Sequence, residues 1–565
     1  MHVSISRLSL LATAVLLACK PSDRGDAGAA SGENGGTVVM TIAGEPDFLI
    51  PPFIELATGN QVADLIFDRL AEPGLDLNTF GDRGFEPELA ESWTWGADSL
   101  SISFKLNSRA RWHDGRPVTS RDVRFTHQLY TDSTAASPVA GLLTNIDSVS
   151  TPDSLTAVFW FKRRHPEQFF DASYQMRILP EHALSRIRRS DLRSSEFNRR
   201  PIGSGPFRFV RWEPGALVEL AADTTNYRGR PKLDRVIWSI APGYPPALAK
   251  LLAGEADFIE FVPPPVVPQI REKPELELRP YGSLDYGFVQ LNLRDQANAR
   301  RPHPLFGDRA LRRALSMAVD RPAIVRNVFG DNGRVAFGPF TRAVATADTT
   351  IAQLPYDTAA AARLLDSLGW RDRNGDGVRE RNGRQLRFSL AFPTSSAIRR
   401  QAATLLQESF RKVGARVDIE PYELTAFSSR LRDGKFDAAM NAWHLDPSPG
   451  VVRQSWGGEA ARSGGVNYGK YESQQFDAYM DSAAHEMDLE RARAHWRRAY
   501  ETIIADAPAI FLYETVNNVG VHKRVRTPGM RADAWWSDVR DWSIPEAERI
   551  PRDRIGAGAA PAPAR

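Results

Sequence analysis

The side chains that could carry out catalysis do not form a familiar catalytic pattern. A serine between two glycines occurs at residues 203–205, but the nucleophile elbow of hydrolases requires the spacing G-x-S-x-G. The ten histidines are scattered, and none belongs to an H-E-x-x-H zinc motif. His113 and Asp114 are adjacent in a polar turn, where a structural role is favoured over a catalytic one. The sequence therefore argues against an enzyme, with a secreted hydrolase as the alternative.

A short acidic loop is the best candidate for a metal site. Asp372, Asn374 and Asp376 have the spacing of the first ligands in a calcium loop. The twelfth position is Gly383, whereas a calcium loop needs a glutamate that binds the ion through both oxygens. This incomplete ligand set favours a tight turn between a helix and a strand over a calcium site. We expect no metal and no cofactor.

The single cysteine, Cys19, predicts a covalent modification. Residues 1–18 carry a positive charge at Arg7, followed by an apolar run that is too short to span a bilayer. The run ends with the letters L-L-A-C, which resemble the bacterial lipobox, whose cysteine is lipidated and becomes the new N-terminus. An ordinary signal peptide with an incidental cysteine is the alternative. We expect a lipid anchor at Cys19, with the inner or outer membrane left open.

The composition is that of a folded protein with several domains. The 565 residues suggest three or four domains at roughly 150 residues each. Lysine and arginine number 72 and aspartate and glutamate 69, a balance too even for a nucleic-acid partner. Residues 19–36 are rich in glycine, alanine and serine, as in a flexible tether, and residues 551–565 have the composition of a disordered tail.

Hydrophobic periodicity separates a β-rich part from an α/β part. The alternation of Leu100, Ile102, Phe104 and Leu106 predicts a half-buried strand. In the C-terminal half, the order of strand, helix and strand predicts a βαβ unit in a parallel sheet. We expect strands at 38–43, 100–106, 415–420, 436–443 and 509–513, and helices at 59–70, 120–129, 309–319, 358–368, 395–413, 425–432 and 490–505.

The βαβ unit places a polar loop where α/β proteins bind ligands. Trp443 ends the second strand and Asp446 follows it, and ligands in open α/β sheets bind past the carboxyl ends of strands. Trp443 could stack on a ligand, with core packing as the alternative. Asp446 precedes Pro447, so a turn in which the carboxylate binds only backbone is the alternative to ligand contact.

Several segments, taken in order, resemble one protein family. They are residues 89–93 (LAESW), 104–106 (FKL), 112–123 (WHDGRPVTSRDV), 203–207 (GSGPF), 254–257 (GEAD), 308–315 (DRALRRAL), 467–468 (NY) and 476–477 (FD). This ordered set covers nearly the whole chain after Cys19. It resembles the bacterial extracellular solute-binding proteins of family 5, the oligopeptide, dipeptide and nickel group.

The resemblance implies an α/β fold of the periplasmic-binding type II class. It has two lobes with a ligand cleft between them, an extra domain, and a first lobe that is discontinuous in the sequence. Binding energy then favours a closed form, because ligand contacts are complete only when both lobes touch it. The boundaries we expect are 1–18 signal peptide, 19–36 tether, 37–75, 203–280 and 509–550 first lobe, 76–202 extra domain, 281–508 second lobe and 551–565 tail.

The resemblance also implies which residues touch the ligand. Peptide-binding relatives place an aspartate in the loop of Asp446 to pair with the α-amino group of the ligand, although the loop here is shorter. A carboxylate opposite an ammonium group selects an N-terminus. The other candidates lie on strand ends or in loops that the family brings near its ligand: Trp443, Asn467, Tyr468, Tyr286, Asn292 and Glu45.

The function implied is that of a monomeric solute-binding lipoprotein of an ABC importer. It would sit at the periplasmic face of a bacterial membrane, capture oligopeptides or dipeptides and pass them to the permease subunits. The same fold could instead bind a nickel chelate, a saccharide or another small solute, or act in sensing.

Overall fold

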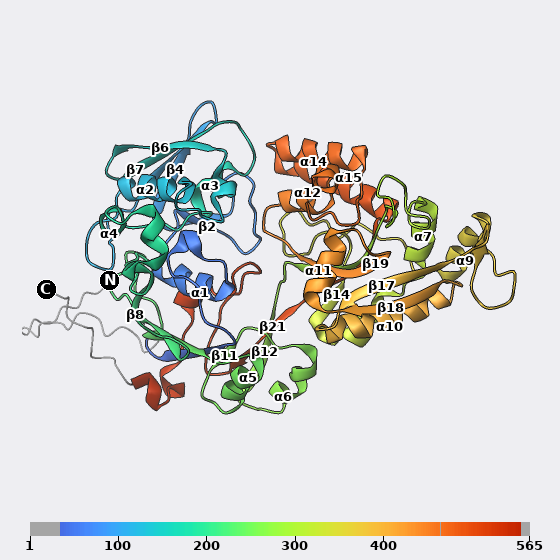
Figure 1. Ribbon diagram of the computed structural model, residues 1–565. Helices are drawn as coiled ribbons and strands as arrows, with labels where there is room; N and C mark the ends of the chain where they lie inside the picture. The colour runs from blue at the N-terminus through green and yellow to red at the C-terminus, as the bar shows by residue number, and fades with distance from the viewer. Residues whose placement is uncertain (1–33, 464, 555–565) are drawn as a thin grey trace, which may run out of the picture.

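The computed structural model describes residues 34–463 and 465–554. Cys19, the expected signal peptide and most of the tether lie outside these residues, as does the end of the chain. The chain forms three sheets of four or more strands, which lie apart from one another in Figure 1. Of the helices in the described part, none is both long and apolar enough to cross a bilayer.

The first lobe is built around a seven-stranded sheet whose strands come from three distant parts of the chain. β1 lies parallel to both of its neighbours, β10 and β11, and the other pairings are antiparallel. In spatial order the strands are β12 (Leu276–Tyr281), β21 (Asn517–His522), β11 (Phe258–Ile259), β1 (Thr37–Ile42), β10 (Arg235–Ile240), β9 (Leu217–Ala222) and β8 (Phe207–Glu213). The expected strand at 38–43 is confirmed.

The extra domain carries a four-stranded antiparallel sheet at the upper left of Figure 1. Ile102, Phe104 and Leu106 are fully buried on one side of β5, which confirms the predicted half-buried strand. Thr119 and Asp122 form a reciprocal capping box at the start of α2. The elements are β4 (Ala90–Trp95), β5 (Ser101–Leu106), β7 (Thr156–Phe161), β6 (Ile146–Asp153), α2 (Ser120–Thr131), α3 (Gln168–Ser173) and α4 (Glu181–Leu184).

The second lobe contains a mixed six-stranded sheet, at the right of Figure 1. β17 lies parallel to β18 and to β19, which confirms the predicted parallel arrangement, and β13 is antiparallel to β19 and β20. The side chain of Asp357 caps α9 (Thr358–Ser367), at the start of the helix expected at 358–368. In order the strands are β14 (Gly333–Val335), β20 (Ala509–Thr515), β13 (Asp285–Leu291), β19 (Ala438–His444), β17 (Arg387–Pro393) and β18 (Arg416–Tyr422).

The strand pairing corrects one expected boundary. β20 pairs with β13 and β14, so it lies in the sheet of the second lobe, although the sequence assigned residues 509–550 to the first lobe. The chain returns to the first lobe only at β21, which pairs with β11 and β12. Residues 282–284 and residue 516 are therefore the two connections between the sheets.

The remaining elements complete the layers and loops. They are α1 (Ala57–Ile66), β2 (Ala71–Pro73), β3 (Phe85–Pro87), α5 (Tyr244–Leu252), α6 (Val267–Arg271), α7 (Arg309–Met317), α8 (Arg321–Val328), α9 (Thr358–Ser367), β15 (Glu380–Arg381), β16 (Arg384–Gln385), α10 (Ala397–Arg411), α11 (Leu424–Arg432), α12 (Gly450–Trp456), α13 (Gly458–Arg462), α14 (Gln474–His485) and α15 (Leu489–Asp506). Figure 1 shows α14 and α15 beside the six-stranded sheet, facing the extra domain.

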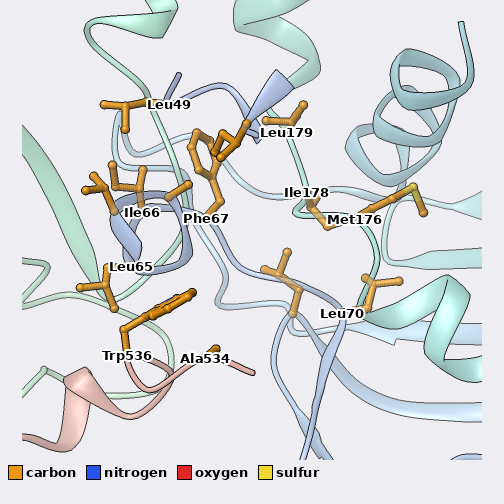
Figure 2. Packing of buried hydrophobic residues seen from close by; sticks show 14 of the residues in the cluster. Leu49, Leu65, Ile66, Phe67, Leu70, Met176, Ile178, Leu179, Ala534 and Trp536 are labelled. Carbon is orange, nitrogen blue, oxygen red and sulfur yellow. The ribbon is translucent and has the colours of Figure 1, made fainter. Parts of the chain in front are cut away.

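The first lobe and the extra domain share one hydrophobic core. Its buried members lie within residues 38–258 and 519–544. Figure 2 shows part of it, with Ile66 and Phe67 at the end of α1 near Ile178 and Leu179, and Trp536 beside Leu65. A shared core of this kind makes the first lobe and the extra domain one body.

The loop between β2 and β3 is the exception, because it packs against the second lobe. Leu77 and Phe80 are buried within a cluster whose other members belong to the second lobe. The ring of Phe80 meets that of Trp496 on α15 edge to face, with centroids 5.0 Å apart. The contact joins the two bodies on the side away from their chain connections.

The acidic loop at 372–380 has the geometry of a turn. The Asp372 carboxylate accepts backbone N–H groups from Gly375 and Gly377, and the Asp376 carboxylate accepts the N–H of Val378. The segment joins α9 to the β15–β16 ribbon, as the turn interpretation expects.

Candidate functional site

A cavity of about 610 Å³ lies between the two bodies of the molecule. The first lobe contributes α1 and residues 533–536, the extra domain contributes residues 174–177, and the second lobe contributes the loop between β19 and α12. We call this space the interlobe cavity. Its volume falls within the range of about 300–1,000 Å³ that is usual for sites holding small molecules.

Asp446 faces the interlobe cavity from the loop after β19. Its neighbour Leu445 is buried, and the Leu445 N–H donates to the carbonyl of Leu284 at 2.8 Å, which fixes the loop. Asp446 itself is exposed, and its carboxylate has no hydrogen bond or ion pair within the residues that the structure describes. The structure therefore does not support the alternative in which the Asp446 carboxylate binds only backbone groups in a turn.

His444, the last residue of β19, precedes this loop and binds Asp285. His444 Nδ1 lies 3.0 Å from Asp285 Oδ1. The hydrogen bond to Asp285 raises the pKa of His444, and the charges of Asp285 and Asp446 add to the effect. At acidic pH the imidazolium group would then compete with a ligand cation for Asp446.

The opposite wall of the cavity carries a paired charge cluster on α1. Asp64 binds Arg177 through a short hydrogen bond, lies 2.7 Å from Arg69 Nη1, and accepts the indole N–H of Trp536 at 2.7 Å. Burial alone would raise the pKa of Asp64, but Arg177 and Arg69 outweigh burial and lower the pKa below its usual range. Both guanidinium groups are thus committed to a protein carboxylate.

A second cluster of paired charges lies beside the cavity, and two of its members, Tyr174 and Asp533, line it. The Tyr174 hydroxyl donates to Asp533 at 2.5 Å, and Arg531 binds Asp533 at 2.6 Å and Glu72 at 2.7 Å. Burial, followed by the charge of Asp533, raises the pKa of Tyr174 well above its usual value. The cations around the cavity are therefore neutralised.

The carboxylates of Asp446 and Glu55 are the charges left without a partner among the described lining residues. Unpaired negative charge in a cavity favours the positive end of a ligand.

Three of the candidates from the sequence are buried inside the protein, and their expected contact with a ligand stays a prediction. Tyr286 is fully buried and accepts the indole N–H of Trp456 at 2.9 Å. The Asn292 amide donates to the carbonyls of residues 434 and 436 and accepts from residue 294. The Asn467 amide donates to the carbonyls of residues 457 and 471 and accepts from residue 471. Their polar side-chain atoms form hydrogen bonds within the protein, as buried polar groups usually do.

The other candidates lie near the cavity without lining it. Trp443 and Tyr468 are half-buried and pack together, with ring centroids 5.8 Å apart. Glu45 accepts the indole N–H of Trp212 at 2.7 Å, so it anchors the β8–β9 hairpin and does not face the cavity. Asp446 is the one candidate that the structure brings to the interlobe cavity.

The sequence did not indicate the residues of the opposite wall. Asp64 and Asn60 lie on the polar side of α1, which reads as a solvated face in an isolated helix. Arg177 and Trp536 are far from α1 in the sequence and reach it only through the fold. No local pattern could have predicted their meeting.

Comparison with known proteins identifies the family. The pattern of the bacterial extracellular solute-binding proteins, family 5 Middle, matches residues 84–463. The chain belongs to this family. The oligopeptide-binding protein AppA of Bacillus subtilis (strain 168) is 26% identical over 494 residues, which cover 86% of this chain and 88% of that protein.

Solved structures of family 5 proteins have the same fold. AppA from Bacillus subtilis in complex with a nonapeptide has a TM-score of 0.68 and 26% identity, over 91% of this chain and 99% of that chain. NikZ from Campylobacter jejuni in complex with Ni(L-His) has a TM-score of 0.69 and 24% identity, over 90% of this chain and 99% of that chain. The expected periplasmic-binding type II fold is confirmed. AppA is named for binding oligopeptides, which is consistent with a binding role for this family member.

Proposed function

We propose that this protein captures peptides in the interlobe cavity and delivers them to the permease of an ABC importer. The relative AppA is named for binding oligopeptides and was solved with a nonapeptide. The single observation that carries the proposal for this chain is the unpartnered carboxylate of Asp446 in the cavity. A zwitterionic peptide presents an ammonium group at one end, and Asp446 is placed to receive it.

The arginines around the cavity do not compete with a ligand ammonium group for the Asp446 carboxylate. Arg69 and Arg177 are held by Asp64, and Arg531 is held by Asp533 and Glu72. A ligand ammonium group therefore gains an attraction that the free protein does not already have. Closing the second lobe over the ligand would remove water from this pair and strengthen it.

Isothermal titration calorimetry with peptides tests the role of Asp446. Asp446→Ala is expected to weaken the binding of a free peptide at least tenfold, because a charge-assisted hydrogen bond is lost. The same peptide with an acetylated N-terminus should bind the wild type weakly and lose nothing further in the variant. Glu459→Ala, an exposed carboxylate of the second lobe outside the cavity, is the matched control. Equal affinity of Asp446→Ala and wild type for the free peptide would exclude the amino-group role.

The class of ligand has its own test. Mass spectrometry of the molecules that co-purify in the cavity should find peptides of mixed sequence. Recognition of the N-terminal ammonium group does not depend on particular side chains of the peptide. A single defined solute, such as a nickel chelate or a saccharide, would replace peptides as the ligand.

We also propose a lipid anchor at Cys19, from the lipobox-like letters that precede it. Acyl chains contribute about 0.8 kcal/mol per buried CH₂ group, so several chains hold a protein firmly on a membrane. Metabolic labelling with a fatty acid should mark the wild type and not Cys19→Ser, and the variant should leave the membrane fraction. Labelling that persists in Cys19→Ser would refute the anchor at this residue.

A further inference from the structure

The charged side chains that line the interlobe cavity are more acidic than basic. Four carboxylates and two guanidinium groups line the cavity, together with one imidazole, and no lysine is among its described lining residues. An excess of carboxylates in a confined space raises the local concentration of cations. The cavity can therefore discriminate between ligands by charge, beyond the one ammonium group that every free peptide carries.

Ion pairs within the protein engage two of these carboxylates. Asp64 is held by Arg69 and Arg177, which are the two guanidinium groups of the lining. Asp533 is held by Arg531, which lies beside the cavity. These pairs leave two lining carboxylates for a ligand, and each comes from a different lobe.

Glu55 is the free carboxylate of the first lobe. It precedes α1, and its backbone N–H donates to the Asp47 carboxylate at 2.7 Å. The N–H of Leu56 donates to the same carboxylate at 3.2 Å, so the backbone is fixed at this point. Glu55 is exposed, and its carboxylate has no hydrogen bond or ion pair among residues 34–463 and 465–554. The carboxylate is thus carried by a fixed backbone and is open to a ligand.

Asp446 is the free carboxylate of the second lobe, in the loop after β19. The imidazole of His444 lies 3.0 Å from Asp285, so its hydrogen bond goes to a carboxylate of its own lobe. A ligand with one ammonium group can satisfy only one of the two free carboxylates. A ligand with two cations can satisfy both, and it would then join the two bodies of the molecule.

We propose that the interlobe cavity selects dicationic peptides, which carry a lysine or arginine side chain close to the N-terminus. The α-ammonium group binds Asp446 and the basic side chain binds Glu55. This inference rests on the proposed capture of peptides and names the class of peptide that the cavity prefers. The second ion pair forms only when both lobes contact the ligand, so its energy favours the closed form.

The chemistry of basic side chains suits this arrangement. Lysine and arginine carry their charge at the end of a long flexible stem, so the charge can reach a wall that the peptide backbone does not touch. The basic residue must be close to the N-terminus because Glu55 and Asp446 line the same cavity.

Calorimetry with matched peptides tests the preference. Lysine is compared with norleucine, which has the same number of side-chain carbons and no charge, at the first and at the second position of an alanine tripeptide. At the position that reaches Glu55, the wild type is expected to bind the lysine peptide about fivefold more tightly, since a partly exposed ion pair adds modestly to affinity. Raising the salt concentration should reduce this difference.

Glu55→Gln tests the residue. The variant should bind the lysine peptide as weakly as the norleucine peptide, and its affinity for the norleucine peptide should equal that of the wild type. Folding is preserved because the Glu55 side chain is exposed. Glu91→Gln, which removes an exposed carboxylate of the extra domain outside the cavity, should change neither affinity.

Two results would overturn the proposal. One is equal affinity of the wild type for lysine and norleucine peptides at both positions. The other is a Glu55→Gln variant that weakens both kinds of peptide equally, because Glu55 would then act only through the general field of the cavity. In either case the proposed function stands if Asp446→Ala still weakens peptides with a free N-terminus. If no peptide binds the wild type, the proposed function fails, and the preference for basic side chains fails with it.

Discussion

Asp446 differs from the buried candidates Asn292 and Asn467 in one physical respect, which is whether its polar side-chain atoms already have hydrogen-bond partners within the protein. Asn292 and Asn467 were chosen for their residue type and place in the sequence, yet each amide binds backbone groups that a loop would otherwise leave unsatisfied. Asp446 follows a buried leucine in a fixed loop and keeps its carboxylate free. The sequence predicted the loop correctly, but hydrogen-bond saturation depends on distant partners and could not be predicted.

Glu167 makes a pH-dependent contact between the extra domain and the second lobe. Burial raises its pKa from an ordinary 4.5 to about 6, more than its hydrogen bond from Thr79 lowers it. The folded protein therefore holds a proton between pH 4.5 and 6 that the unfolded chain releases, and stability falls as pH rises through this window. The difference corresponds to about 2 kcal/mol at neutral pH.

Glu167→Gln should remove the loss of folding stability that comes from burying the ionised carboxylate. The melting temperature of the variant relative to wild type is expected to rise between pH 4.5 and 7, because only the wild type must bury a charge there. Calorimetric scans across this range check it, with Glu459→Gln as an exposed control whose difference from wild type stays flat. A melting difference that is independent of pH would show that Glu167 titrates normally.

At the scale of elements, the family signatures hold the fold together. Both ring nitrogens of His113 bind the backbone of the glycine-rich segment, at 3.0 Å from the carbonyl of Gly205 and 3.3 Å from the N–H of Gly203. A Cβ atom on Gly203 would lie 1.8 Å from the carbonyl oxygen of Ile66, so only glycine fits there. Burial lowers the pKa of His113 to about 4, which keeps the ring neutral and able to donate and accept at once. These motifs identify the family because the fold requires them.

The spacing of nearby residues predicted the helices and strands that form through local interactions. The βαβ order around α11 and the alternation in β5 both follow from nearby residues. The pairing of β20 with β13 joins strands far apart in the chain, and the run of buried residues in β20 fits either sheet equally well. The boundary at residue 508 was misplaced for this reason.

At the scale of the whole molecule, two bodies are joined by two chain connections and meet again beside the interlobe cavity. The first lobe and the extra domain share a core, and the second lobe joins them through residues 282–284 and residue 516. Across the cavity, the ring of Phe80 packs on Trp496, and Ser448 donates to Glu167 at 2.9 Å. A hinge with short connections and a small opposing contact suits a protein that must open to load and close to hold its ligand.

Phe80→Ala should shift this protein toward an open form. Replacing a buried phenylalanine with alanine typically costs about 3–5 kcal/mol, and here the loss falls on the contact between the two bodies. Small-angle X-ray scattering without ligand should give a larger radius of gyration for Phe80→Ala than for wild type. Saturating peptide should bring the two values together, because the ligand supplies contacts that exist only when the bodies are closed. Phe261→Ala, which removes an exposed ring of the first lobe, should scatter like wild type. If Phe80→Ala keeps the wild-type radius without ligand, the loop between β2 and β3 does not hold the molecule closed, and the hinge connections alone must set its conformation.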